Sequence, residues 1–131
     1  RFGDLYQGRV DLYFAHAGYE FIAETKRTES GFTLKVIKAR DNLARKLKTA
    51  CREIRQTPPN KQRRLGIVFA VPYFRKSCKD KVDEHLQAWA NLLKDLDTSA
   101  YAWVFPKCSR NLFDGTYYSP GLAVLVKEIK R

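Results

Sequence analysis

The stretch GRVDLYFAHAGYEFIAETK, which runs from Gly8 to Lys26, has the alternating pattern of a β-hairpin. With a period of two, its apolar side chains fall on one face and most of its charged side chains on the other. The first face comprises Val10, Leu12, Phe14, Phe21, Ala23 and Thr25, and the second comprises Arg9, Asp11, Tyr13, Glu20, Ile22, Glu24 and Lys26. We therefore predict a half-buried hairpin whose turn is centred between Ala17 and Gly18.

A turn at this position places Asp11 directly opposite Glu24, and Lys26 follows on the same face. The same register pairs Leu12 with Ala23 and Phe14 with Phe21. Directly opposite side chains have Cβ atoms roughly 4.5 to 5.5 Å apart, so two carboxylates there repel each other and require a compensating cation. Mg²⁺ suits this role, because it takes one or two carboxylates and completes its coordination with water and phosphate oxygens. The polar face therefore predicts phosphodiester hydrolysis, in which a metal and an ammonium stabilise the charge of the transition state.

At these residues the chain resembles the PD-(D/E)xK nuclease superfamily, which has the restriction-endonuclease-like fold. Asp11 matches the first acidic position, and Glu24, Thr25 and Lys26 match the acidic-x-Lys triplet on the next strand. Val10 stands where the name-giving proline would be. The resemblance covers the hairpin closely and the following helix and strand loosely, which is roughly the first half of the chain.

The resemblance implies an α/β fold with a mixed sheet, a β-hairpin active site and flanking helices. It also implies a Mg²⁺-dependent endonuclease, with Mn²⁺ as the alternative ion, in which Asp11, Glu24 and Lys26 carry catalysis. The metal ligands would be Asp11, Glu24 and the backbone carbonyl of Thr25. Double-stranded DNA is implied as substrate more often than RNA, and many such nucleases act as homodimers. A helix carrying a further carboxylate often precedes the first strand in this superfamily, but no such helix is visible upstream of Asp11.

The charge distribution points to the same class of partner. The chain carries a net charge of +11, and residues 26 to 64 hold thirteen basic and three acidic residues, which leaves +10 of that excess. From about Asp41 to Gln56 the apolar residues repeat with a helical period, and cations fall on the opposite side. Nucleic-acid binding is predicted for that cationic side and for the hairpin, through Arg9, Arg45, Lys48, Arg52 and Arg55. An ordinary exposed helix face would mix charges of both signs.

The remaining elements complete an α/β pattern. Phe32 to Lys38 fits either a third strand or the start of the helix. Leu65 to Val71 is continuously apolar and predicts a central strand that ends at Pro72 and is covered on both faces. Further predictions are a helix from about Asp80 to Leu96, a buried strand from Ala100 to Phe105, and a last strand from Leu122 to Val126.

Size and composition predict one domain that spans residues 1 to 131. The chain begins at Arg1 and contains no methionine, so we expect a segment of a longer protein. No apolar run approaches a membrane span and no signal peptide is visible, so the expected location is cytoplasmic. The three cysteines show no C-x-x-C pairing and are expected to be reduced and mostly buried, at Cys51, Cys78 and Cys108.

Three readings of function remain open from the sequence. The first is the metal-dependent nuclease. The second is a module that keeps the fold and binds nucleic acid within a larger complex without cutting it. The third, a secreted or injected nuclease toxin, rests on small size and high charge alone. A solvated strand with alternating charges would also produce an acidic-x-Lys triplet, although it would not place Asp11 in matching register.

Overall fold

The computed structural model describes residues 11–31, 36–58, 61–75, 80–106, 117–118 and 121–130. Within these residues the chain has a mixed α/β fold. Its elements in chain order are β1 (Leu12–His16), β2 (Tyr19–Gly31), α1 (Val36–Arg55), β3 (Arg63–Arg75), α2 (Val82–Lys94), β4 (Ala100–Val104), β5 (Tyr117–Tyr118) and β6 (Leu122–Ile129).

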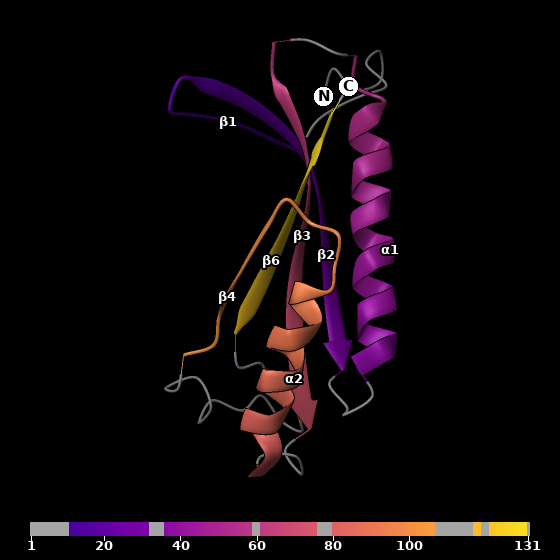
Figure 1. The fold of residues 1–131 in the computed structure, drawn as a ribbon, viewed down its shortest axis with the longest axis vertical. Coiled ribbons are helices and arrows are strands. Elements are labelled where there is room, and N and C mark those ends of the chain that lie inside the picture. Colours follow the sequence, from indigo (N-terminus) through magenta and orange to yellow (C-terminus); the bar gives the residue numbers. More distant parts are fainter. Residues whose placement is uncertain are drawn as a thin grey trace.

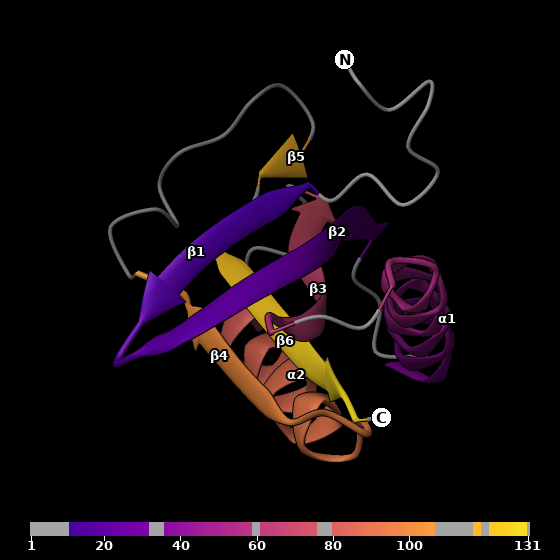
Figure 2. The same cartoon turned by 90° about the horizontal axis from the view of Figure 1, so that it is seen from above.

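The strands form one mixed sheet in the order β1-β2-β3-β6-β4, and the short β5 pairs with the end of β3 (Figures 1 and 2). The pairing of β2 with β3 is parallel, and the other pairings are antiparallel. Both described helices pack on the same face of the sheet, where their buried residues join one core with side chains from β2, β3 and β6. In the described part of the chain, neither helix is long and apolar enough to span a bilayer.

The hairpin has the predicted turn and register. Ala17 and Gly18 both have positive φ, 51° and 81°, as the two central residues of a tight hairpin turn require. Leu12 pairs with Ala23, and Phe14 pairs with Phe21 and stacks on it at 4.9 Å between ring centroids. The hairpin projects away from α1 at its turn end (Figure 1).

The end of the hairpin, the helix and the next strand form a crossover, in which α1 joins the parallel strands β2 and β3. All five residues of the predicted apolar stripe of α1 are buried, namely Leu43, Leu47, Ala50, Cys51 and Ile54. The helix begins at Val36, earlier than the periodicity suggested, so residues 36 to 38 open the helix instead of ending a strand. Residues 32 to 35 lie outside the described part of the chain.

The central position of β3 is confirmed, because β2 and β6 flank it on both edges. Its predicted end at Pro72 is wrong, since β3 continues to Arg75. The last β3 residue paired with β6 is Ala70, so Pro72 lies beyond the stretch where β3 is hydrogen-bonded to β6. The predicted cover is shown for one face, where both described helices pack, and among the described residues strand side chains pack on the other face.

The prediction that residues 100 to 105 form a buried strand is wrong. β4 is an edge strand, all five of its residues are exposed, and Trp103 retains 42% of its accessible surface. Its apolar sequence resembles that of a central strand, but it has a single neighbour, β6. An apolar run alone does not distinguish these two positions in a sheet.

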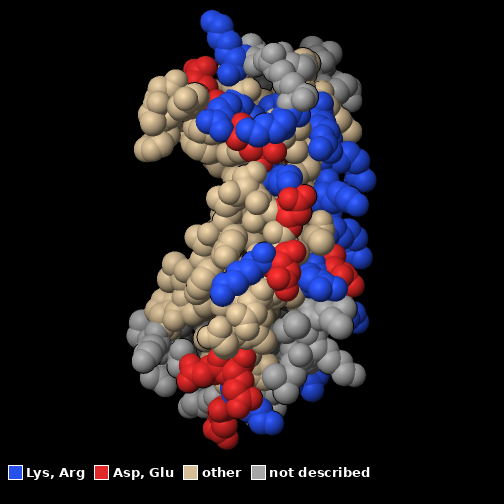
Figure 3. Space-filling view, in the orientation of Figure 1, with Lys and Arg blue, Asp and Glu red and all other residues tan. Residues whose placement is uncertain are grey.

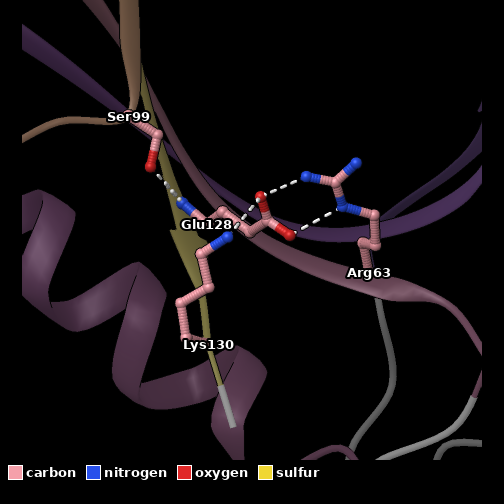
Figure 4. A network of polar contacts seen from close by, with 4 residues as sticks. All are labelled: Arg63, Ser99, Glu128 and Lys130. Carbon is pink, nitrogen blue, oxygen red and sulfur yellow. Dashed lines mark hydrogen bonds and ion pairs between the residues drawn. The ribbon is translucent and has the colours of Figure 1, made fainter.

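A polar network joins the start of β3 to the end of β6 (Figure 4). Arg63 donates two hydrogen bonds to the Glu128 carboxylate, one of them from Nε to Oε2 at 2.7 Å. The backbone N–H of Glu128 donates to Ser99 Oγ at 2.9 Å. The carboxylate raises the pKa of Arg63, and the guanidinium lowers the pKa of Glu128. Arg63 is thus neutralised within the fold, and its guanidinium also lies 5.0 Å from the centroid of the Tyr19 ring.

Several predictions fall outside the described residues and stay predictions. They concern Arg9 and Val10 at the start of the hairpin, and the burial of Cys78 and Cys108. Cys51 is a free, buried thiol, as expected, and burial raises its pKa.

Candidate active site

The polar face of β2 lies against α1 and not against solvent. Ile22 and Thr28, which belong to this face, are buried, and Glu24 and Lys26 lie between them in a half-buried setting. Asn42 of α1 donates a hydrogen bond from Nδ2 to Thr28 Oγ1 at 2.8 Å, which ties the helix to this face of the strand. The acidic-x-Lys triplet therefore sits where a helix covers the edge of the core.

Gly66 explains how α1 comes so close to the triplet. It is the β3 partner of Glu24 in the parallel register. A Cβ at Gly66 would lie 2.8 Å from Cys51 Sγ and 3.0 Å from Cys51 N, both in α1. Only a residue without a side chain allows the helix backbone to approach β3 at this point. The close approach positions the C-terminal half of α1 over Glu24 and Lys26.

Thr25, which lies between Glu24 and Lys26 in the triplet, holds Asp11 against β2. Asp11 Oδ2 accepts hydrogen bonds from Thr25 N at 3.0 Å and Thr25 Oγ1 at 3.3 Å, and the N–H of Asp11 donates to the Ala23 carbonyl at 3.1 Å. The N–H and C=O of one residue in an extended strand point to the same edge, so the Thr25 carbonyl is directed to the edge where Asp11 lies.

The carboxyl group of Glu24 is in an unfavourable environment for its charge. Burial, Asp11 and Glu53, in that order of importance, raise its pKa from 4.5 to about 7. Two of these causes are neighbouring carboxylates, so the site concentrates negative charge at one point beside the sheet. Crowding of this kind is expected where a cation or a proton is to be held.

Lys26 extends towards the helix, where its Nζ lies 2.6 Å from Glu53 Oε2. Its pKa is raised, first by the hydrogen bond to Glu53 and further by the charges of Glu53, Glu24 and Asp11, against the opposing effect of burial. The side chains of Lys26 and Glu53 keep 28% and 33% of their accessible surface. The ammonium therefore lies beside the Glu53 carboxylate, and the charges of Glu24 and Asp11 also act on it.

The sequence interpretation missed Glu53. It counted this residue only as one of the three acidic residues between positions 26 and 64. Glu53 lies on α1 between buried residues, since Ala50 and Ile54 are both fully buried. A lone carboxylate that borders the apolar stripe of a helix needs a partner nearby, and this signal was available in the sequence. The helix that follows the hairpin thus adds a third carboxylate beside Glu24.

Asp11, Glu24 and the Thr25 carbonyl are too few to hold a metal through protein ligands alone, so an ion that keeps several waters, such as Mg²⁺, would fit them better. Among the residues that the structure describes, no group of three or more His, Cys, Asp or Glu side chains could hold a metal ion. Mg²⁺ needs fewer protein ligands, because it usually keeps several waters and binds one or two carboxylates together with substrate phosphates. Asp11 and Glu24, with the Thr25 carbonyl, are the candidate ligands of such a smaller set, and the Asp11 carboxylate contributes, after burial, to the raised pKa of Glu24.

The cationic side of α1 is exposed as predicted. The four cations predicted for this side are all exposed, and we refer to them as the α1 cations: Arg45, Lys48, Arg52 and Arg55. Within the described ranges, no carboxylate forms an ion pair with any of them. Figure 3 shows Lys and Arg side chains gathered along the flank formed by α1. Three other cations of residues 26 to 64 are occupied within the fold, because Lys26 and Arg63 are ion-paired and Arg64 is buried.

Glu20, His85 and Phe74 take part in contacts that do not involve Asp11, Glu24 or Lys26. Glu20 is exposed near the turn and accepts a 2.6 Å hydrogen bond from the Tyr13 hydroxyl. His85 is buried and packs against Phe74 at 5.5 Å between ring centroids, so it is a core residue. Phe74 is itself fully buried and does not offer a surface for stacking on a base.

Comparisons with known proteins do not assign the chain to a family. A scan of protein-family models, a search of curated proteins and a search of solved structures each found no match to this chain.

Proposed function

We propose that the chain is a metal-dependent endonuclease with a restriction-endonuclease-like fold, which hydrolyses phosphodiester bonds in DNA in preference to RNA. One observation carries the proposal: Asp11, Glu24 and Lys26, separated in sequence by a hairpin turn, come together where α1 crosses β2. Carboxylates crowded at one point repel one another, which disfavours folding. Such a cluster is therefore expected where a bound cation or a proton offsets the repulsion. Hydrolysis of a phosphodiester uses both carboxylates and an ammonium.

Each residue has a role in this proposal. Asp11, Glu24 and the Thr25 carbonyl would hold Mg²⁺ or Mn²⁺, and the bound ion would lower the pKa of a water and offset charge on the phosphate. Thr25 keeps Asp11 in place through its N–H and hydroxyl. Lys26 orients the attacking water and stabilises the negative charge that develops on the phosphate oxygens. The α1 cations hold the phosphate backbone of the substrate.

A second function, a nucleic-acid-binding module without catalysis, is favoured by one separate observation. The α1 cations are exposed and free of ion pairs with described carboxylates, whether or not the carboxylate cluster binds a metal. Binding to the phosphate backbone needs only these cations. The two functions differ in what happens after binding.

The experiment incubates the chain with plasmid DNA and with structured RNA, in Mg²⁺ or in a chelator. The variants are Asp11→Asn, Glu24→Ala and Lys26→Ala, with Glu20→Gln as a matched control on the same strand. The endonuclease predicts cleavage that requires Mg²⁺, is lost in the three site variants and persists in the control, while all proteins still bind. Binding in every sample with cleavage in none would leave the module as the function.

A further inference from the structure

We propose that Glu53 is a positioning residue, which fixes the ammonium of Lys26 beside the carboxylates of Asp11 and Glu24. The inference rests on the proposed nuclease function and adds to it a residue on a separate element. Its starting point is a direct contact between α1 and β2, in which Lys26 Nζ lies 2.6 Å from Glu53 Oε2, an oxygen buried from solvent.

The contact restricts a side chain that would otherwise be mobile. A lysine has a flexible four-carbon stem, and its rotamer entropy opposes confinement. On a half-exposed strand without a partner, the ammonium of Lys26 would spread over many positions. The carboxylate of Glu53 selects the positions near α1, where Asp11 and Glu24 also act on the ammonium.

Glu53 can act in this way because its helix is firmly held. Its neighbours Ala50 and Ile54 are fully buried, and the α1 backbone lies directly over Gly66. At the C-terminal end of α1 the buried Arg64 donates a hydrogen bond to the Thr57 carbonyl at 3.2 Å. Packing of α1 in the core therefore fixes the position of the Glu53 carboxylate. The fixed carboxylate in turn restricts the position of the Lys26 ammonium.

Stability alone does not explain the pair. A partly exposed ion pair contributes little to the free energy of unfolding, while charged groups that border a core lose hydration. Moreover, Glu53 adds to the negative charge around Glu24, which makes the cluster less favourable for folding. A site that must hold its groups in a fixed geometry benefits from such support, because a misplacement of about 1 Å can lower a rate roughly 100-fold.

The test compares Glu53→Gln with Asp97→Asn. Glutamine keeps the length of Glu53 and removes its charge, and Asp97→Asn removes another ion pair of the same length, 2.6 Å to Lys127, which does not involve Lys26. We expect kcat for DNA cleavage to fall about 10- to 100-fold in Glu53→Gln with KM within about twofold of wild type. Asp97→Asn should keep both constants, and Glu53→Asp, which retains the charge, should recover part of the loss in kcat.

A second measurement does not need activity. NMR relaxation of the Lys26 side chain should report a restricted ammonium in the wild-type chain and in Asp97→Asn, and a mobile one in Glu53→Gln. Equal order of Lys26 in the wild type and Glu53→Gln, or an unchanged kcat in Glu53→Gln, would overturn the positioning role. If the wild-type chain cleaves nothing, the nuclease proposal fails, and the relaxation data still decide whether Glu53 orders Lys26.

Discussion

Replacing Glu24 by glutamine should make the protein more stable at neutral and alkaline pH while it removes cleavage. In the folded chain the pKa of Glu24 is raised from 4.5 to about 7 by burial and by the carboxylates of Asp11 and Glu53. The folded state therefore keeps a proton that the unfolded chain releases above pH 4.5. Between these two pKa values the folded state binds more protons, so the free energy of unfolding decreases as pH rises and levels off above about 7.

The size of the stability gain in Glu24→Gln follows from the shift in the pKa of Glu24. The difference between 4.5 and about 7 corresponds to an upper bound of about 3 kcal/mol at 1.36 kcal/mol for each pKa unit. Because Glu24 is partly exposed, solvent screening reduces this to about 1 to 2 kcal/mol. For a domain of this size such a gain raises Tm by about 3 to 8 °C. Below pH 4.5 the gain should vanish, because Glu24 is then protonated in both states.

The assay is urea unfolding at pH 4.5, 6 and 8 in the presence of a chelator, with Glu20→Gln as the control. Glu20 lies on the same strand and is exposed, so its replacement makes the same chemical change outside the cluster. The stability gap between Glu24→Gln and wild type should widen from pH 4.5 to pH 8. A gap that is independent of pH, or a variant less stable than wild type at pH 8, would refute the reasoning. Adding Mg²⁺ at pH 8 should stabilise the wild type more than the variant.

Three further predictions concern binding and the fold. Replacing all four α1 cations with glutamine should weaken DNA binding and reduce the slope of log K against log salt by about three to four, measured by fluorescence anisotropy; an unchanged slope would place the interface elsewhere. Ala17→Asn should raise the unfolding free energy by up to about 1 kcal/mol in chemical denaturation, because asparagine tolerates the positive φ of 51° better than alanine; a loss of stability would contradict this account of the turn. Gly66→Ala should lower the unfolding free energy by about 1 to 3 kcal/mol, since its Cβ would meet Cys51 Sγ at 2.8 Å, and a neutral result would show that α1 can shift at little cost.

Local patterns account for the parts of the fold that the sequence predicted well. The Ala17-Gly18 turn and the alternation around it predicted the register in which Leu12 pairs with Ala23, because a one-residue slip would turn every apolar side chain to the other face. The period of α1 predicted its buried stripe for the same kind of reason. The β4 strand was predicted to be buried, and it is an exposed edge, because an apolar run does not record how many neighbours a strand has.

In the candidate site, too, some features follow from local sequence patterns and others follow only from tertiary packing. The sequence by itself determined that Glu24 and Lys26 share one face of a strand and predicted Asp11 opposite Glu24, since a β-strand repeats every two residues and a tight turn sets which residues meet. Only the tertiary structure decided that α1 covers this face, that Gly66 allows its close approach, and that Glu53 meets Lys26. The physical reason is that these contacts join elements far apart in the chain, and their geometry depends on how the helix packs on the sheet, which no local periodicity encodes.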